Sequence, residues 1–491
     1  MADTFPKYLL ILGTASHVGK SAIVTGLCRI FSEKYRVAPF KAQNMSLNSW
    51  ITKDGKEIGI AQAIQAKAAR IDPTADMNPV LLKPKGDRLS QVVVLGEPFA
   101  DRSAGSYYDS IHEMHDVLKG SLNRLGNDYE LIIMEGAGGA AEINLYDRDI
   151  VNIGSARLTQ APIILVGDIE RGGVFASLYG TIALLPEDVR KQVKGFIINK
   201  FRGDEAILRP GIEKLEKLTA IPVLGVLPYS KLGIPSEDSV SIDDKTDSRE
   251  KQYDVDVAVI RLPHISNFTD FEPLERIANV RYVDLDESLG APDAVIIPGT
   301  KNTISDLLDL HSSGMSTQIK ALHGKIPVIG ICGGYQMLGK IIKDAGIEGD
   351  KDAVYEGLGL LDIETVFDEY RKTTEQVTKR VNSGSPLFDS ICGEEVHGYE
   401  IHMGASSSRS PVFGDDGCIG SDGMVVGTYL HGLFANRNVR KAFISYIISK
   451  KGLQFEEEDI ESDPYEDLAD ILRTHLDLEQ IYDILSLEPP A

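Results

Sequence analysis

Cysteine is scarce in this sequence. The 491 residues contain 4 cysteines, namely Cys28, Cys332, Cys392 and Cys418, and no two of them form a C-x-x-C pair. This density is far below that of a disulfide-stabilised scaffold. We therefore expect a reduced protein, and we predict a cytoplasmic location.

Basic charge is also in short supply. The chain has 51 lysines and arginines against 73 aspartates and glutamates, which gives a formal net charge of −22. Because a nucleic-acid backbone requires a basic protein face, this balance argues against nucleic acid as the main partner. It leaves anionic small molecules open, since a local glycine-rich or basic site can bind them.

Long hydrophobic runs are missing as well. No apolar stretch reaches the length of a membrane span, so we expect no membrane partner. The N-terminal MADTFPKYLLILGT lacks the basic start and the cleavage site of a signal peptide. Hydrophobic residues still make up 43% of the chain, as in ordinary globular proteins. The length predicts two or three domains.

Short apolar segments bounded by glycine or proline recur along the chain, and helix-like segments separate them. This alternation predicts a doubly wound α/β fold with buried parallel strands, and it restarts after residue 254 as a second α/β domain. We predict strands at 8–13, 131–136, 162–168, 195–200 and 222–228, helices at 19–35 and 58–71, and strands of the second domain at 255–263, 293–300, 327–332 and 422–432.

The domain boundaries follow from composition. Residues 236–254 are polar and highly charged, which is typical of a linker, with a long surface loop as the alternative. We therefore expect a first domain at 1–235 and a second at 255–445. The remaining stretch, 446–491, is acidic and helical in pattern, and the sequence indicates no function for it.

The segment GTASHVGKS, residues 13–21, follows the first predicted strand and opens a helix. Backbone N–H groups around Gly13, Thr14 and Gly19 can approach the phosphates of ATP, and Lys20 adds a positive charge. Ser21 can place its hydroxyl on Mg²⁺. The alternative is an ordinary glycine-rich turn between a strand and a helix. The glycine at position 13 lies one residue earlier than the strict G-x-x-x-x-G-K-[ST] pattern requires.

This shifted spacing resembles dethiobiotin synthetase and its relatives, whose loops contain G-T-x-x-x-V-G-K-[ST]. LIIMEGAGG, residues 131–139, is similar to the second signature of that group. Glu135 ends a predicted strand, where a carboxylate can hold Mg²⁺ against the phosphates; a helix-capping role is the alternative. Asp168 is a weaker candidate for metal or substrate. Asn199 resembles the adenine-facing asparagine of related nucleotide-binding folds.

PVIGICGG, residues 327–334, has the form of a nucleophile elbow, in which a strand, a sharp turn and a helix follow one another. Cys332 would stand at the turn, and the N–H of Gly333 would favour a thiolate and an oxyanion. A buried structural cysteine is the alternative. A thiol nucleophile requires a base, and His431, between glycines after a predicted strand, is the best-placed histidine.

Together these segments resemble the class I glutamine amidotransferases, which release ammonia from glutamine through a cysteine thioester. IIPGTKNT, residues 296–303, is similar to the loop that supplies a second oxyanion N–H in that family, here at Gly299. Most members carry a glutamate two residues after the histidine, but this chain has Leu433 there. Glu400 or a backbone carbonyl could orient His431 instead.

In its missing glutamate and in the order of its domains, the chain resembles the cobyric acid synthase family over about residues 7–445. The resemblance implies that ATP activates a carboxylate as an acyl phosphate and that ammonia from glutamine converts it to an amide. The implied corrinoid substrate is adenosylcobyrinic acid a,c-diamide, amidated at carboxylates b, d, e and g. The amide side chains of Gln43, Asn44 and Asn48, with Arg171 or Arg202, would suit this acceptor, and loop hydrogen bonding is their alternative role.

Other classes remain open from sequence alone. The related cobyrinic acid a,c-diamide synthase shares both halves, but it tends to carry a G-P-D-Y segment where this chain has FKAQNMSLNS, residues 40–49. An amidotransferase for another polycarboxylate, a partitioning-type ATPase, a cysteine peptidase-like hydrolase and an inactive scaffold are further alternatives. The sequence indicates no oligomeric state.

Overall fold

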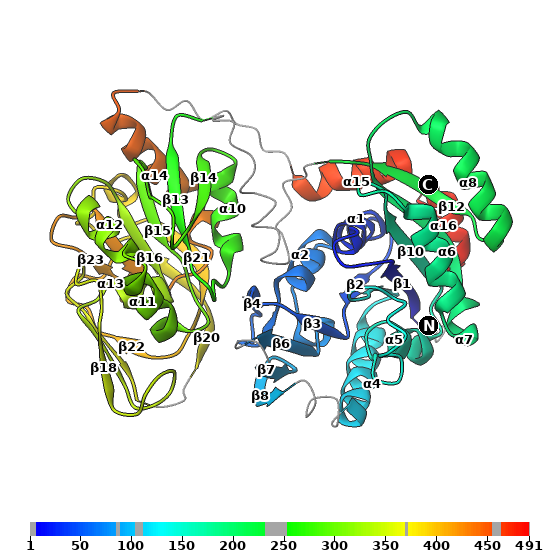
Figure 1. Ribbon diagram of the computed structural model, residues 1–491, viewed down its shortest axis with the longest axis horizontal. Coiled ribbons are helices and arrows are strands. Elements are labelled where there is room, and N and C mark those ends of the chain that lie inside the picture. Colours follow the sequence, from blue (N-terminus) through cyan, green and yellow to red (C-terminus); the bar gives the residue numbers. More distant parts are fainter. Residues whose placement is uncertain are drawn as a thin grey trace. The chain divides into compact units, whose positions relative to one another are not determined.

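The computed structural model describes residues 6–84, 89–103, 111–230, 253–368, 372–453 and 463–490. The chain forms two compact units, whose elements are labelled in Figure 1. Unit 1 consists of Met1–Ser46, Glu57–Pro235 and Glu461–Ala491, and unit 2 consists of Leu47–Lys56 and Ser236–Ile460.

These units differ from the domains expected from sequence, each of which was one continuous stretch. A short segment of the N-terminal half, Leu47–Lys56, belongs to unit 2, and the C-terminal helices belong to unit 1. Composition does not reveal such crossings, because it does not show which unit a segment packs on. Most of the expected linker, 236–252, lies outside the described residues.

Unit 1 contains a six-stranded sheet in which every strand is parallel to its neighbours. Its strands are fully or largely buried, which explains their continuous apolar sequences. The predicted strands of the first half are confirmed, and β2 joins them at one edge. In spatial order they are β12 (Val223–Pro228), β11 (Val193–Phe201), β10 (Ile163–Asp168), β1 (Lys7–Gly13), β9 (Leu131–Glu135) and β2 (Val37–Phe40).

Helices and a smaller sheet complete the N-terminal part of unit 1. Both predicted helices form, as α1 (Lys20–Phe31) and α2 (Ile60–Ala68). The smaller sheet has the order β3 (Gln43–Met45), β6 (Val80–Pro84), β7 (Leu89–Val94) and β8 (Glu97–Ser103). The other elements are β5 (Glu57–Gly59), η1 (Ala75–Met77), α4 (Ile111–Asp128), α5 (Ile153–Thr159), α6 (Val174–Leu184), α7 (Glu187–Arg190) and α8 (Glu205–Thr219).

The C-terminal helices α15 (Pro464–His475) and α16 (Leu478–Leu485) pack on α1 (Figure 1, red). A Cβ placed on Gly26 of α1 would lie 2.4 Å from Cδ1 of Leu472, so the glycine lets the two helices approach closely. Arg29 of α1 forms ion pairs with Asp463 at 2.5 Å and Glu466 at 2.7 Å. These two helices, for which the sequence indicates no function, therefore cover an apolar face of unit 1.

Unit 2 contains a second six-stranded sheet, with five parallel strands and one antiparallel edge strand. The predicted strands of the second domain are confirmed in it, and they are shorter than expected. Their order is β14 (Asn279–Asp284), β13 (Asp256–Arg261), β15 (Ala294–Ile297), β16 (Val328–Ile331), β24 (Val425–Thr428) and β23 (Cys418–Ile419).

Further elements of unit 2 surround this sheet. A four-stranded sheet has the order β18 (Ala353–Glu356), β17 (Ile341–Asp344), β19 (Glu364–Phe367) and β22 (Ala405–Ser406), and β20 (Thr373–Arg380) pairs with β21 (Glu395–His402). The remaining elements are β4 (Ser49–Ile51), η2 (Phe268–Phe271), α10 (Glu272–Glu275), α11 (Thr303–Ser312), α12 (Met315–Leu322), α13 (Gly333–Leu338), η3 (Asp389–Ile391), η4 (Leu433–Ala435) and α14 (Arg437–Lys450).

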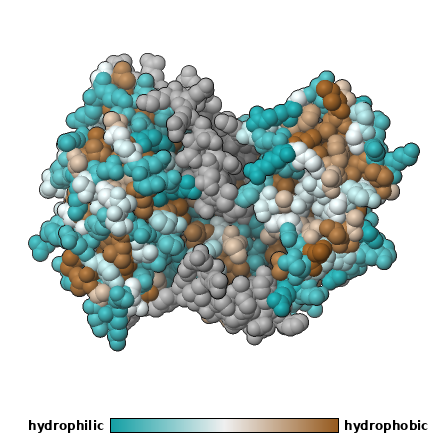
Figure 2. Space-filling model, viewed as in Figure 1, coloured by the Kyte–Doolittle hydropathy of each residue, from teal (hydrophilic) through white to brown (hydrophobic). Residues whose placement is uncertain are grey.

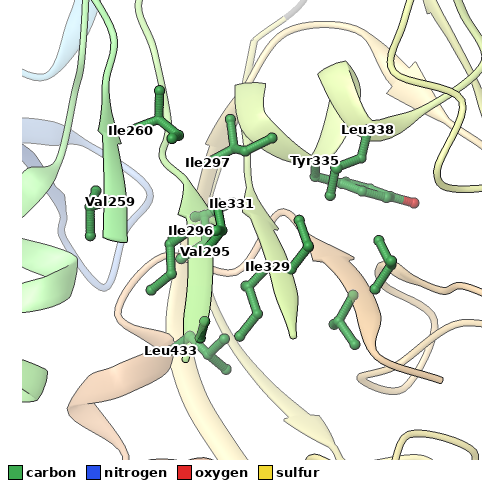
Figure 3. Close-up of a cluster of buried hydrophobic side chains, with 14 of the residues drawn as sticks. Val259, Ile260, Val295, Ile296, Ile297, Ile329, Ile331, Tyr335, Leu338 and Leu433 are labelled. Carbon is green, nitrogen blue, oxygen red and sulfur yellow. The ribbon is translucent and has the colours of Figure 1, made fainter. Parts of the chain in front are cut away.

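The core of unit 2 lies between its large sheet and the helices. Figure 3 shows Ile296 and Ile329 from the sheet with Leu338 of α13 in one apolar cluster. Leu433, from the segment that follows β24, lies in the same cluster and is fully buried. The ends of the central strands are therefore held by close packing, which fixes the turns that leave them.

Figure 2 shows hydrophobic and hydrophilic residues interspersed on this face of the protein. Among the described residues, no helix combines the length and the apolar character that crossing a bilayer requires.

Replacement of Leu472 by alanine tests the contact between α15 and α1. Leu472 is fully buried, so Leu472→Ala should lower the free energy of unfolding by about 2–5 kcal/mol. Leu218→Ala is the matched control, because Leu218 of α8 is 61% exposed and its loss should matter little. Urea unfolding curves of both variants provide the measurement, and equal curves would contradict this packing.

Candidate active sites

The phosphate loop of unit 1 joins the end of β1 to the start of α1. Lys20 is the first residue of α1, and its Nζ donates hydrogen bonds to the carbonyls of Ala15, at 3.0 Å, and Gly138, at 2.9 Å. The ammonium group is therefore held across the loop. Backbone N–H groups at the start of α1 and this cation together form a site suited to phosphate.

Asn199 of β11 lies against the same loop. Its Nδ2 donates to the carbonyl of Val18 at 2.8 Å. Gly19 has a φ of 101°, and a Cβ there would lie 2.0 Å from Nδ2 of Asn199. The glycine is thus required both by its backbone conformation and by the close approach of the asparagine. The structure brings Asn199 to the nucleotide loop, and its role at the adenine stays a prediction.

Glu135 ends β9 and is almost completely buried. Its Oε1 accepts hydrogen bonds from the Ser21 hydroxyl and from Nζ of Lys41, both at 2.9 Å. Its Oε2 accepts one from Nε2 of Gln65 at 2.5 Å. The neighbouring oxygens of Ser21 and Glu135 form the kind of hard-ligand pair that suits Mg²⁺. The residues present therefore fit the expected metal.

Sequence reasoning missed Lys41 and Gln65 as partners of Glu135. Lys41 directly follows β2, so it lies at the same carboxyl edge of the sheet as Glu135. Its position one residue after a buried strand was the available signal. Asp168, the weaker candidate, pairs with Lys200 at 2.8 Å.

Cys332 stands between β16 and α13 with a φ of 52° and a ψ of −109°, a positive-φ conformation that is rare outside glycine. The glycines around it are fixed by packing. A Cβ on Gly334 would lie 2.1 Å from the carbonyl oxygen of Ile297, and one on Gly330 would lie 2.5 Å from Cδ1 of Leu338. The strained turn is thus the elbow that the sequence predicted, with the thiol at its apex.

Gly333 and Gly299 are the two predicted oxyanion donors. Gly333 is the first residue of α13, whose first N–H groups have no partner within the helix. Gly299 follows β15, and a Cβ placed on it would lie 3.0 Å from Cε1 of His431. Its carbonyl accepts a hydrogen bond from Ser266 at 2.9 Å, which fixes the loop.

His431 follows β24 and is nearly fully buried. Its Nδ1 lies 2.7 Å from Oδ2 of Asp270, and the other oxygen of Asp270 accepts the N–H of Gly432 at 2.9 Å. The carboxylate that sequence could not locate is therefore Asp270 of η2. Glu400 does not take this role, because it pairs with Lys379 at 3.2 Å and His402 at 3.7 Å.

The charge state of His431 follows from these neighbours. Burial lowers its pKa by desolvation, but the charge and hydrogen bond of Asp270 and the hydrogen bond with Cys332 outweigh this effect. The net result raises the pKa of His431 to about 10. A protonated imidazole beside a thiol stabilises the thiolate, which is the nucleophilic form.

Comparison with known proteins agrees with both halves of this arrangement. Residues 9–238 match the CobQ/CobB/MinD/ParA nucleotide binding domain, and residues 256–439 match the CobB/CobQ-like glutamine amidotransferase domain. A probable cobyric acid synthase of Methanococcoides burtonii is 72% identical, with 98% of each chain covered. One of Methanosarcina mazei is 69% identical, covering 97% of this chain and 99% of the relative.

The chain belongs to the cobyric acid synthase family. The α/β fold and the two-domain resemblance expected from sequence are thus confirmed. In this chain, the buried Asp270 on the short 3₁₀ helix η2 contacts His431. It does so in place of the glutamate expected two residues after the histidine in most class I amidotransferases.

Tyr399 is a further neighbour of His431 that sequence reasoning did not single out. Its ring stacks on the imidazole, with centroids 5.3 Å apart and planes at 15°. It belongs to VHGYEIHMG, residues 396–404, which also contains His397 and His402. Those histidines have other partners, because His402 stacks on Tyr429 and His397 contacts Thr378.

Replacing Asp270 by asparagine tests its role. The Asp270→Asn variant loses the charge that raises the pKa of His431, so the imidazolium should deprotonate at lower pH. The alkaline limb of kcat/KM for glutamine hydrolysis should move toward neutral pH, and kcat should fall by roughly 10²-fold or more.

Glu400→Gln is the matched control for this prediction, since Glu400 is also a buried carboxylate of unit 2 but pairs with Lys379 and His402. Its pH profile of glutamine hydrolysis should keep the parent shape. An unchanged profile in Asp270→Asn would show that Asp270 does not set the charge of His431.

Proposed function

We propose that this protein is an ATP- and glutamine-dependent amidoligase that converts peripheral carboxylates of a corrinoid into amides. The observation that carries the proposal is the presence, in one chain, of a phosphate loop with Lys20, Ser21 and Glu135 and of a buried Cys332–His431–Asp270 arrangement. The two together fit a reaction that consumes ATP and takes nitrogen from glutamine. The near full-length similarity to probable cobyric acid synthases supports the corrinoid substrate.

In the glutaminase reaction, Sγ of Cys332 attacks the amide carbon of glutamine. The N–H groups of Gly299 and Gly333 stabilise the oxyanion that forms. His431 donates its proton to the leaving nitrogen, so ammonia departs and a thioester remains. Water then attacks the thioester, with His431 as the base, and glutamate is released.

In the synthetase reaction, a carboxylate oxygen of the corrinoid attacks the γ-phosphorus of ATP. ADP leaves, and an acyl phosphate forms. Backbone groups of Gly13, Thr14 and Gly19 with the Lys20 ammonium bind the phosphates, and Asn199 faces the adenine. Ser21 and Glu135 would hold Mg²⁺, which neutralises charge on the phosphates when bound. Ammonia then attacks the acyl carbon, phosphate leaves, and an amide results.

The substrate we propose is adenosylcobyrinic acid a,c-diamide, with amidation at carboxylates b, d, e and g. The amide side chains of Gln43 and Asn44 remain candidates for contacts with it. Asn48 serves a different purpose, because its side chain bonds within unit 2. We place the reaction in the cytoplasm, without nucleic acid or membrane as partners.

Two substitutions separate the half-reactions. Cys332→Ala should abolish amidation from glutamine but preserve amidation from a high concentration of free ammonia. Lys20→Ala should abolish both, since it removes the cation at the phosphates. Corrinoid amide formation with each nitrogen source is the measurement. Loss of the ammonia-dependent reaction in folded Cys332→Ala would overturn this division of roles.

Product mass distinguishes the proposed substrate from its close alternative. Glutamine labelled with ¹⁵N at the amide should add label at the b, d, e and g positions when adenosylcobyrinic acid a,c-diamide and ATP are supplied. Cobyrinic acid should be a poor substrate. Efficient labelling of carboxylates a and c of cobyrinic acid, without further amidation, would instead identify a cobyrinic acid a,c-diamide synthase.

A further inference from the structure

Residues Leu47–Lys56, here called the arm, belong to unit 2 although the residues on both sides of them belong to unit 1. The arm contains β4 and turns back through a hydrogen bond from the N–H of Thr52 to the carbonyl of Lys56 at 2.8 Å. Its first polar residues, Asn48 and Ser49, are each 1% exposed. Polar groups buried to this extent require hydrogen-bond partners, and those partners show what the arm holds in place.

The first contact of the arm is with the start of η2. Oδ1 of Asn48 accepts the N–H of Phe268 at 3.1 Å, and the N–H of Ser49 donates to Oδ1 of Asn267 at 2.9 Å. Asn267 adopts a left-handed conformation with a φ of 53° directly before η2. This pair of bonds therefore fixes the entry to the short helix that carries Asp270.

The second contact of the arm is with the stack on the histidine. The hydroxyl of Tyr399 donates to the carbonyl of Ser49 at 3.0 Å. One ring neighbour of Tyr399 is Trp50 of the arm, at a centroid distance of 5.0 Å, and another is His431. In addition, Nδ2 of Asn267 lies 3.4 Å from Nδ1 of His431. The arm thus supports both the ring stack and the edge of the imidazole that faces Asp270.

We infer that the arm is a structural part of the glutaminase site and that Asn48 is a positioning residue for the Asp270–His431 pair. Asn48 acts through the backbone of Phe268, which begins η2. The inference rests on the proposed function of Cys332 and His431. It assigns a segment from the N-terminal half of the chain to catalysis by unit 2.

Asn48 can position the Asp270–His431 pair because few residues separate its contact at Phe268 from Asp270. Asp270 lies two residues after Phe268, so a shift at the start of η2 also displaces the Asp270 carboxylate. A displacement of about 1 Å in a catalytic arrangement can lower a rate by roughly 10²-fold. The arm should therefore affect kcat far more than the KM for glutamine.

The test uses full-length protein with Asn48→Ala. We expect kcat for glutamine hydrolysis to fall by roughly 10- to 10²-fold with KM altered by less than about threefold, while ammonia-dependent amidation persists. Asp54→Ala is the matched control, because Asp54 lies at the tip of the same arm and contacts Thr52. It should keep the parent kcat.

A double-mutant cycle shows whether Asn48 works through Asp270. In the Asp270→Asn background, Asn48→Ala should lower kcat by no more than about twofold, because the pair it positions is already broken. Full additivity of the two losses would overturn the inference. So would a parent-like kcat in folded Asn48→Ala.

A second variant covers the case in which Asn48→Ala fails to fold. Tyr399→Phe removes only the hydroxyl that bonds to Ser49 and leaves the ring on His431, and it should also lower kcat with little change in KM. A parent-like kcat there would overturn the inference. Glutamine hydrolysis by Cys332→Ala would instead overturn the proposed function, so the two failures are distinguishable.

Discussion

The buried contact between Asp270 and His431 is the interaction on which the glutaminase arrangement depends. An isolated imidazolium would be costly at this depth, but the aspartate 2.7 Å from the imidazole raises the pKa of His431 and so favours its protonated form. The second oxygen of Asp270 is satisfied by the N–H of Gly432. This matters for catalysis because a protonated His431 can stabilise the Cys332 thiolate and later donate its proton to the departing nitrogen.

Close packing supplies the other half of that arrangement. Cys332 is held in a strained conformation with a φ of 52°, which only a tightly determined environment maintains. Gly330 and Gly334 permit β15, β16 and α13 to approach so closely that a methyl group at either position would overlap its neighbours. The thiol is therefore placed by the sheet itself, whereas the histidine is placed by a loop, by Asp270 and by the arm. A rigidly held thiol is thus paired with an imidazole that has several separate supports.

The sequence predicts what depends on local spacing. The strands, the phosphate loop and the Cys332 elbow each combine a short apolar run with glycines at a turn. Such patterns lie within one short stretch of the sequence. Asp270 has no such pattern, because it lies 161 residues before His431. Lys41 and Gln65 likewise reach Glu135 only through the fold. The crossing of the arm into unit 2 was invisible for the same reason: its partners, Asn267 and Tyr399, are distant in sequence.

Leu433 explains why the carboxylate must come from elsewhere in this chain. Leu433 occupies the position at which the resemblance to class I amidotransferases predicts a glutamate. It is fully buried in the apolar cluster of unit 2 (Figure 3). A carboxylate at that place would be buried among Ile and Val side chains, where an unpaired charge is strongly unfavourable. Directing that segment into the core excludes it from orienting the imidazole. An acid from another element is then required, and η2, anchored by the arm, presents Asp270 to Nδ1 of His431.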